Sequence, residues 1–429
     1  MNNSTGLSRR SFLRNVAIAG VVAQALPLAG ARAQGAARKL KVALIGCGGR
    51  GSGALDNCHE AAKIAGVELE VVAVADVFQD RANGQGGKYN VPADRRFVGF
   101  DAYHKVLEQP GLELVLLATS PNFRPLHLEA AIAAGKNVFM EKPVAVDPPG
   151  VRRVLAAGAA AKTKNLCIVA GTQRRHEKGY RRNAKAIEAG AIGRIVGGTV
   201  SWCGGALWYK TRDANEDDAH YMVRNWTSFT EMSGDHIVEQ HVHNLDVAQW
   251  FIGRTPVAVL GFGGRARRKT GDQFDFFSLD LDYGSDCHLH SMCRQVNGCD
   301  GGVGEFFVGT EGVCYGGGAL QAAGDKKIEL ADVPGHDNPY VQEHVDLLEA
   351  IVKGTPTNEA ENVAHATMAA IMGRISAYTG KQIRWTEVMQ NEQSPFFNVK
   401  LAPAADDFEK GPVVAPKDDV FAVPGQPSA

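Results

Sequence analysis

The glycine-rich segment at residues 46–51, Gly-Cys-Gly-Gly-Arg-Gly, constrains the fold of this chain more than any other feature. It directly follows an apolar run of strand-forming residues at 41–45 and precedes a segment of helical character at 52–65. A second apolar run at 71–75 ends at Asp76. In this order of strand, G-x-G-x-x-G, helix and strand with a terminal acid, the motif predicts a dinucleotide-binding fold.

Each glycine of the motif has an expected role. Gly46 permits the tight turn, Gly48 lets the backbone approach a pyrophosphate, and Gly51 allows the helix to pack closely on the strand. Asp76 would accept hydrogen bonds from the adenosine ribose and repel a 2′-phosphate, which favours NAD over NADP, although Arg50 or Arg81 would soften that preference. The expected cofactor-binding residues of this region are Gly46, Gly48, Gly49, Arg50, Gly51 and Asp76.

Further strand and helix signals alternate along the first half of the chain. Apolar runs at 114–118, 137–140 and 167–170 are separated by segments of helical character. Strands that alternate with helices predict a parallel, doubly wound sheet, here over residues 38–172. Because a fold alone does not define chemistry, a Rossmann domain without enzymatic activity stays an alternative at this point.

Lys142 stands at the end of one predicted strand, within Glu141-Lys142-Pro143. The carboxyl edge of a parallel sheet faces the ligand crevice in such folds, so we expect this lysine to lie in the site. There its side chain could move a proton to or from a substrate hydroxyl. An ordinary surface lysine is the alternative, which the preceding apolar strand and the following proline disfavour.

Several segments together resemble the glucose–fructose oxidoreductase/inositol dehydrogenase (Gfo/Idh/MocA) family. They are the glycine-rich turn, residues 118–122 with His127, and residues 135–143, which contain the Glu-Lys-Pro sequence. The resemblance implies an α/β fold, with an N-terminal Rossmann domain and a C-terminal α/β domain that has an open, mainly antiparallel sheet. It also implies tightly held NAD(P) and sugar or polyol substrates. It adds these expected cofactor contacts: Thr119, Asn122, His127, Glu141, Lys142 and Gln173.

A second landmark of the family lies at residues 234–253. At about 100° per residue, a continuous helix would bring four polar side chains to one face: His236, Glu239, His243 and Asp246. An acid one turn before a histidine can orient the imidazole for acid–base catalysis, so we expect Glu239 and His243 to be catalytic together with Lys142. The family has Asp where this chain has Glu239, which puts a direct contact of the longer side chain with substrate in doubt.

Two other interpretations fit the same helix face. The histidines and acids could form a satisfied structural network. They could also bind a metal ion, but no H-E-x-x-H pattern supports this, and we assign no metal.

Residues 173–176, with Tyr180, begin the second predicted domain at 173–390 and resemble the family segment that lines the nicotinamide and substrate pocket. Residues 202–226 then hold many aromatic rings amid polar sequence. Aromatic faces can stack on sugar rings, while Arg and Asn bind hydroxyls or an anionic group; anchoring of loops in a small separate core is the alternative. The expected substrate-binding residues are Arg174, Arg175, His176, Tyr180, Trp208, Tyr209, Arg224, Trp226 and His236.

The rest of the chain carries less chemistry. Residues 391–429 contain six prolines and predict an irregular tail that either wraps a neighbouring subunit or stays loose. The expected antiparallel strands are 257–265, 274–283, 286–293 and 304–309, and the expected amphipathic helices are 340–353 and 362–379.

Residues 1–33 are typical of an export signal. A twin-arginine signature at 8–13 precedes an apolar stretch at 16–30, and Ala-Arg-Ala at 31–33 matches a signal peptidase site. The apolar stretch is shorter than the roughly 20 residues of a membrane span. We therefore expect the twin-arginine export machinery as a partner and a periplasmic mature protein without stable membrane insertion.

Charge and composition exclude several other classes of protein. The net charge is −1, with 45% hydrophobic and 22% charged residues, which is typical of a globular protein and argues against a nucleic-acid partner. Four of the 46 basic residues and none of the 47 acidic ones lie in residues 1–33, so the mature chain is moderately acidic. The eight cysteines show no zinc spacing and are expected to be mostly buried thiols, with a late disulfide among Cys287, Cys293 and Cys299 as the minor alternative.

Together these features predict a periplasmic, NAD(P)-dependent oxidoreductase that acts on a sugar or polyol derivative. Since the periplasm offers little free NAD, we expect a tightly bound cofactor that is recycled on the protein. The alternatives are an NAD-dependent glycosidase, lyase or epimerase that oxidises its substrate transiently, a non-catalytic carbohydrate-binding protein, and a metal-dependent lyase or hydrolase. The resemblance also implies a homo-oligomer.

Overall fold

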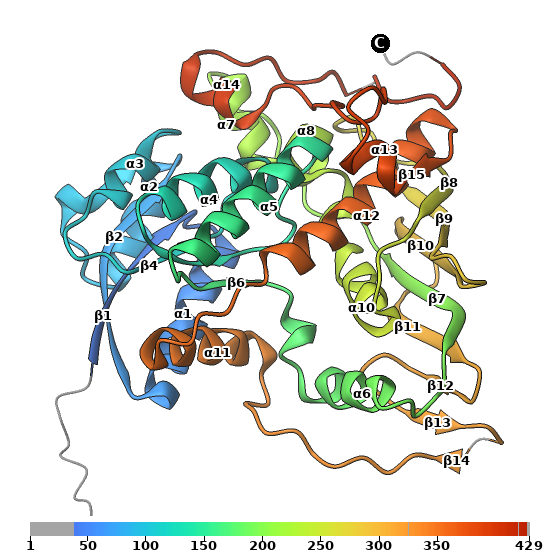
Figure 1. The fold of residues 1–429 in the computed structure, drawn as a ribbon. Helices are drawn as coiled ribbons and strands as arrows, with labels where there is room; N and C mark the ends of the chain where they lie inside the picture. Colours follow the sequence, from blue (N-terminus) through green and yellow to red (C-terminus); the bar gives the residue numbers. More distant parts are fainter. Residues whose placement is uncertain (1–37, 325, 419, 427–429) are drawn as a thin grey trace, which may run out of the picture. The chain divides into compact units, whose positions relative to one another are not determined.

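Two β-sheets organise the chain in the computed structural model (Figure 1). The structure describes residues 38–429, apart from 325, 419 and 427–429. The predicted export signal at 1–33 lies outside the described residues. In the part of the chain that is described, no helix is both long enough and apolar enough to cross a membrane.

The first sheet is wholly parallel, with the strand order β3-β2-β1-β4-β5-β6. This is the order of a dinucleotide-binding Rossmann domain, and it confirms the predicted fold class. The chain reverses direction across the sheet between β1 and β4, and ligands bind such folds at this point. The strands are β1 (Arg38–Ile45), β2 (Val67–Asp76), β3 (Arg96–Val98), β4 (Leu114–Leu117), β5 (Asn137–Met140) and β6 (Ile168–Ala170).

Helices cover both faces of this sheet, which is why its central strands read as continuous apolar runs. Leu40, Val42 and Leu44 of β1 pack toward one face, and Ala43 and Ile45 pack toward the other. One face is covered by α1 (Gly49–Ala65) and by α11 (Pro339–Lys353), which returns from far along the chain. The other helices of the domain are α2 (Gln79–Lys88), α3 (Ala102–Leu107), α4 (Arg124–Ala133) and α5 (Pro148–Thr163).

The second sheet is mainly antiparallel, as expected, in the order β14-β13-β12-β11-β7-β10-β9-β8-β15. Its one parallel pair among the described strands joins β7 to β10. The strands are β7 (Ile195–Gly204), β8 (Ala258–Gly264), β9 (Phe276–Asp282), β10 (His288–Gln295), β11 (Gly302–Gly309), β12 (Gly312–Cys314), β13 (Leu320–Ala322), β14 (Lys326–Lys327) and β15 (Ile383–Arg384).

One face of the second sheet is covered by helices and the other is open. In β9, buried and exposed side chains alternate, with Phe277, Leu279 and Leu281 pointing inward. The inward face packs on α10 (Val242–Ile252) and α12 (Ala360–Thr379), and α12 also contacts α5 of the first domain. The remaining helices are α6 (Lys178–Glu188), α7 (Asp218–Arg224), α8 (Thr230–Ser233), α9 (His236–Glu239), α13 (Trp385–Met389) and α14 (Ala405–Lys410).

The described residues of the tail from 391 pack on the same chain, against the expectation of a loose tail. The backbone N–H of Leu401 donates to Asp147 Oδ2 at 3.1 Å, and Phe408 of α14 is buried against Phe100 and Phe123. Buried apolar side chains and specific hydrogen bonds anchor this segment despite its prolines. All eight cysteines are free thiols, and Cys299 is the exposed one among them.

Candidate active site

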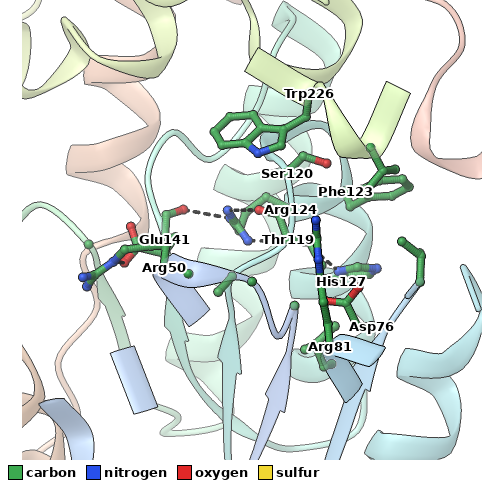
Figure 2. Close-up of a pocket in the computed structure, with 18 of the residues that line it drawn as sticks. Arg50, Asp76, Arg81, Thr119, Ser120, Phe123, Arg124, His127, Glu141 and Trp226 are labelled. Carbon is green, nitrogen blue, oxygen red and sulfur yellow. Dashed lines mark hydrogen bonds and ion pairs between the residues drawn. The ribbon is translucent and has the colours of Figure 1, made fainter. Parts of the chain in front are cut away.

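A cavity of about 760 Å³ lies at the carboxyl ends of the first sheet's strands. Residues that follow β1, β2, β4 and β5 form its floor, and residues of the second domain, including Trp202, Trp226 and His243, form its opposite wall. Figure 2 shows Asp76 and Arg81 at one side, Arg50 and Glu141 at the other, and Trp226 above them. This is where a doubly wound sheet binds its ligands.

The glycine-rich turn lines the cavity and requires glycine at specific positions. Gly46 has a φ of +97°, and a Cβ there would lie 2.6 Å from the carbonyl carbon of Ala118. A Cβ on Gly51 would lie 1.8 Å from the carbonyl oxygen of Gly46, so Gly51 permits close packing but does not line the cavity. No acidic side chain lies in the first turn of α1, and no side chain caps it, so its free N–H groups are available to an anion.

Asp76 ends β2 at the edge of the cavity and is 8% exposed. Its Oδ2 accepts the N–H of Cys47 at 2.7 Å, and its Oδ1 accepts the N–H of Phe78 at 2.9 Å. Burial raises the pKa of Asp76, and the two amides oppose that rise. Arg81 also lines the cavity, and its guanidinium lies over the ring of Phe78 at 4.4 Å. The carboxylate and the arginine together set the polarity of this side of the cavity.

Lys142 follows β5 and reaches across the cavity to the second domain. Its Nζ donates to the carbonyl oxygen of Glu239 at 2.7 Å and to Glu239 Oε1 at 2.9 Å. Each side chain is 14% exposed, so the ion pair is shielded but open to a ligand. Glu239 therefore holds Lys142, although Glu239 was expected from the sequence to orient His243.

The continuous helix expected within residues 234–253 is broken, and His236, Glu239, His243 and Asp246 do not share one face. α9 ends at Glu239, and α10 begins at Val242. The N–H of His241 reaches back five residues to the carbonyl of His236 at 3.3 Å, while the His241 ring contacts Ser291 Oγ at 2.7 Å. This wide turn changes the rotation of every later side chain, so residue spacing alone places them wrongly.

His243 lines the cavity beside the lysine and is otherwise enclosed. Its ring stacks on the indole of Trp202, with centroids 5.7 Å apart and planes 21° apart. Burial lowers the pKa of His243 well below its ordinary value, and the charges of Lys142, Arg174 and Arg50 lower it further. The imidazole is therefore neutral at neutral pH and can accept a proton or a hydrogen bond.

Arg50 of the glycine-rich turn forms ion pairs with two acidic side chains. Its Nε donates to Glu141 Oε1, and its Nη2 lies 3.4 Å from Oε1 of the fully buried Glu343. Its guanidinium also lies over the ring of Tyr340, 4.8 Å from the centroid. Burial raises the pKa of Glu343 well above its ordinary value, and the nearby charge of Glu141 raises it further. This cluster fixes the start of the Glu-Lys-Pro segment.

Most of the other expected cofactor-binding residues line the cavity, and one does not. Thr119, His127, Glu141 and Gln173 line the cavity, and the buried Oε1 of Gln173 has no hydrogen-bond partner among the described residues. Burial and the charge of Arg124 lower the pKa of His127 to about 3. Asn122 lies outside the cavity lining, where its Nδ2 contacts the sulfur of Met232 at 3.3 Å.

Of the nine expected substrate residues, Trp208, Arg224 and Trp226 line the cavity. The others lie outside it because most are committed to buried polar contacts, which a buried charge requires. Arg174 and Tyr180 bind Glu305, Arg175 binds Asp246, His176 binds Asp346, His236 binds Asp235, and Tyr209 binds Tyr221.

Several lining residues were not predicted. Arg124 donates to the carbonyls of Leu117, Thr119 and Glu141 at 2.8 Å each and so joins the ends of β4 and β5 (Figure 2). A Pro-Asn-Phe-Arg-Pro sequence gives no sign of this role. Other lining residues missed are Phe100, Tyr103, Ser120, Phe123, Lys210, Gln240 and Tyr340.

The arrangement fits a dinucleotide and gives no metal centre in the described residues. The glycine-rich turn, the open N-terminus of α1, Asp76 and Gln173, whose Oε1 has no partner among the described residues, all line one cavity. Among residues 38–429, so far as they are described, no group of three His, Cys, Asp or Glu side chains is placed to hold a metal ion. Glu239 and His236, expected on one face, bind Lys142 and Asp235 respectively.

Known proteins resemble the chain over most of its length. An inositol 2-dehydrogenase of Rhizobium meliloti (strain 1021) is 25% identical over 337 residues, which cover 74% of this chain and 92% of that protein. An inositol 2-dehydrogenase of Salmonella typhimurium (strain LT2) is 29% identical over 216 residues, which cover 50% of this chain and 54% of that protein.

Solved structures show the same fold at lower identity. Levoglucosan dehydrogenase in complex with NADH and levoglucosan has a TM-score of 0.64 and 19% identity, covering 81% of this chain and 99% of that one. Aldose-aldose oxidoreductase from Caulobacter crescentus, complexed with glycerol, has a TM-score of 0.62 and 18% identity, covering 81% and 100%.

Two models of one family account for most of the described chain. The oxidoreductase family model with an NAD-binding Rossmann fold matches residues 40–171, and the GFO/IDH/MocA C-terminal domain model matches residues 180–314. Together with the strand order and the glycine-rich turn, they show that this chain belongs to the Gfo/Idh/MocA family of oxidoreductases, with an NAD-binding Rossmann domain.

Proposed function

We propose that this protein is an NAD-dependent oxidoreductase of a sugar or polyol derivative. The observation that carries the proposal is that Lys142, Glu239 and His243 line the same cavity as the glycine-rich turn and Asp76. A proton-transfer group and a dinucleotide site are thus in one enclosure. The inositol 2-dehydrogenase relatives support a polyhydroxylated substrate.

The residues of the cavity have different roles in the proposed reaction. Bound NAD would supply the hydride acceptor that the protein lacks. The neutral His243 accepts the proton of the substrate hydroxyl, and the Lys142 ammonium, held 2.9 Å from Glu239 Oε1, stabilises the oxygen as negative charge develops. Glu239 balances the lysine charge before substrate arrives and keeps its Nζ in a fixed position.

Aromatic side chains provide the surface for the substrate ring. Trp208 and Trp226 meet edge to face, with centroids 6.1 Å apart, and both line the cavity with Trp202. Their apolar faces suit the C–H faces of a sugar, and the Lys210 and Arg224 side chains beside them suit hydroxyl oxygens.

The N-terminal sequence supports a periplasmic protein with a resident cofactor. A cofactor loaded before export must be regenerated on the same chain, which favours redox-neutral turnover. Either one sugar is oxidised and another reduced, or one substrate is oxidised transiently, cleaved or epimerised at an acidified C–H, and reduced again. Cell fractionation tests the location, because replacing both Arg9 and Arg10 by Lys should leave the precursor in the cytoplasm.

The open face of the second sheet supports a homo-oligomer. Leu260, Phe262 and Phe276 are 39%, 73% and 40% exposed on neighbouring strands. An apolar group of this kind is typical of an association surface. Sedimentation analysis of wild type and Phe262→Asp tests this, and a monomeric wild type would contradict it.

Product analysis tests the reaction type. One portion of the protein purified from the periplasm is denatured, and its cofactor is identified by mass spectrometry. A second, native portion is incubated with aldoses, polyols and glycosides without added NAD, and its products are determined. A bound cofactor with two linked products indicates oxidoreduction between sugars, and a cleaved or epimerised product indicates transient oxidation. Carbohydrate binding without any conversion would instead support the non-catalytic alternative.

A further inference from the structure

A second cavity, of about 330 Å³, adjoins the first and shares Trp208 with it. It lies between the aromatic segment of residues 206–209 and the loop that joins β8 to β9. Trp208 is 48% exposed and is a wall of both cavities. A ligand larger than one ring could therefore extend past this indole from the first cavity into the second.

Positive charge dominates the second cavity. Three consecutive residues of the β8–β9 loop line it, Arg267, Arg268 and Lys269, and Asp275 is the one acidic residue in its lining. The charged side chains that line this cavity therefore carry a net charge of +2. Arginine side chains are well suited to carboxylate and sulfate oxygens.

Asp275 builds the loop and is largely occupied in doing so. Its Oδ2 accepts the backbone N–H groups of Ala266, Arg267 and Arg268 at 2.6, 2.6 and 2.9 Å. Its Oδ1 lies 3.6 Å from Arg268 Nε. The carboxylate thus holds Arg267 and Arg268 at the cavity through their backbone, and the loop geometry exists before any ligand binds.

Two buried polar atoms at this cavity lack hydrogen bonds among the described residues. They are Oγ1 of Thr227, a residue that is 5% exposed, and Nε of Arg268, whose side chain is 12% exposed. Leaving a buried donor or acceptor unsatisfied costs about 1–3 kcal/mol, so such atoms at a cavity wall point to a polar ligand.

A polar chain also connects the two cavities. Arg268 Nη2 donates to Gln295 Oε1 at 2.7 Å, and Gln295 Nε2 donates to Oε1 of Gln240, which lines the first cavity, at 2.9 Å. An anion bound at Arg268 would therefore fix a side chain of the first cavity.

We propose that the second cavity is a subsite for an anionic group, a carboxylate or a sulfate ester, on the portion of a carbohydrate beyond the reacting ring. The proposal rests on the proposed function for the first cavity and names the substrate class as acidic glycosides or oligosaccharides. Trp208 stacks on the sugar between the two sites, the loop cations bind the anion, and Thr227 binds a hydroxyl or anionic oxygen.

The test compares cellobiose, its 6′-carboxylate (glucuronosyl-β-1,4-glucose) and its 6′-sulfate by calorimetry on the NAD-loaded protein. The two anionic disaccharides should bind about tenfold more tightly than cellobiose, and added NaCl should weaken their binding selectively. The variant Arg267→Gln/Lys269→Gln, at two exposed positions, should lose most of this preference, while cellobiose serves as the neutral reference. Preference for the carboxylate alone or for the sulfate alone identifies the group.

The matched control is Lys105→Gln/Lys185→Gln, which removes two exposed charges elsewhere. Equal binding of cellobiose and both anionic disaccharides by wild type, or equal effects of the two double variants, would overturn the subsite. Reduction of NAD by sugars is followed in the same samples. Turnover that persists without anion preference counts against the subsite alone, whereas anion preference without any NAD reduction counts against the proposed function alone.

Discussion

The Nζ atom of Lys142 lies 2.9 Å from Oε1 of Glu239 and 2.7 Å from the carbonyl oxygen of the same residue. These contacts join the end of β5 in the Rossmann domain to the end of α9 in the second domain, 97 residues apart. The charged group expected to act on the substrate is thus positioned by both domains. Because burial and nearby cations also keep His243 neutral, the cavity holds a donor and an acceptor side by side.

Replacing Lys142 by Ala should lower kcat by about 10²–10³-fold, the usual cost of removing one group that stabilises developing negative charge. Cofactor content should stay unchanged, because the glycine-rich turn and Asp76 are untouched. Steady-state kinetics and the amount of NAD released on denaturation measure the two effects. Lys185→Ala, at an exposed position, is the control. Full activity of Lys142→Ala with bound NAD would remove this lysine from the mechanism.

Replacing Asp76 by Ser should shift cofactor preference toward NADP by at least about tenfold, since one repulsive charge near the 2′-position is removed. Arg81, already at the cavity wall, would then face the phosphate. Fluorescence titration with NADH and NADPH measures the ratio of affinities. Asp80→Ser removes a nearby charge outside the cavity lining and should leave the ratio unchanged. An unaltered ratio in Asp76→Ser would show that this carboxylate does not select the cofactor.

The buried His176 should stabilise the fold in a pH-dependent way. Burial opposes its charge, but Glu359 at 3.3 Å and Asp346 at 2.6 Å outweigh burial and raise the pKa of His176 to about 10. A raised folded-state pKa means that the stabilisation is complete below the unfolded pKa of about 6.5 and disappears as pH rises through about 10. The full effect is on the order of 5 kcal/mol.

Urea unfolding of wild type and His176→Gln at several pH values measures this difference. The gap in free energy of unfolding should be largest below about pH 6.5 and should narrow toward pH 10. The exposed His290→Gln should show no such narrowing. A gap independent of pH would mean that His176 is not charged in the folded protein.

Replacing Phe408 by Ala should destabilise the fold by about 3–5 kcal/mol, as for other buried phenylalanines. The ring is 4% exposed, and its centroid lies 5.3 Å from that of Phe100 and 5.1 Å from that of Phe123. Because the latter two line the cavity, NAD affinity should also fall. Thermal unfolding measures the stability, and titration with NADH measures the cofactor affinity. Val414→Ala, at an exposed position of the tail, is the control. Unchanged stability would show that the tail does not stabilise the domain.

Local pattern was sufficient to predict the Rossmann domain. The turn at Gly46, the helix after it and Asp76 are all specified within about 40 residues, where strand, turn and helix signals agree. The parallel sheet follows from the βα alternation. The antiparallel sheet was expected too, but β7 was missed because Gly197 and Gly198 interrupt its apolar pattern.

Tertiary contacts explain what the sequence could not predict. Arg174, Arg175 and His176 look like ligand-binding cations, yet each pairs with an acid more than 70 residues away. Glu239 and His243 were linked by a helical period that the wide turn at His241 interrupts. Tyr340 reaches the cavity from α11, and no spacing rule connects it to the glycine-rich turn.

The proposed chemistry is the oxidation of a carbohydrate at NAD, with Lys142 in direct contact with the reacting oxygen. Its most direct test is the reduced-nicotinamide absorbance of NAD-loaded protein in a single turnover with a panel of aldoses, polyols and acidic glycosides. We predict formation of one reduced cofactor per chain with at least one sugar in wild type, at a rate about 10²–10³-fold higher than in Lys142→Ala. Bound NAD that no sugar of the panel reduces, or equal rates of reduction in the two proteins, would contradict this mechanism.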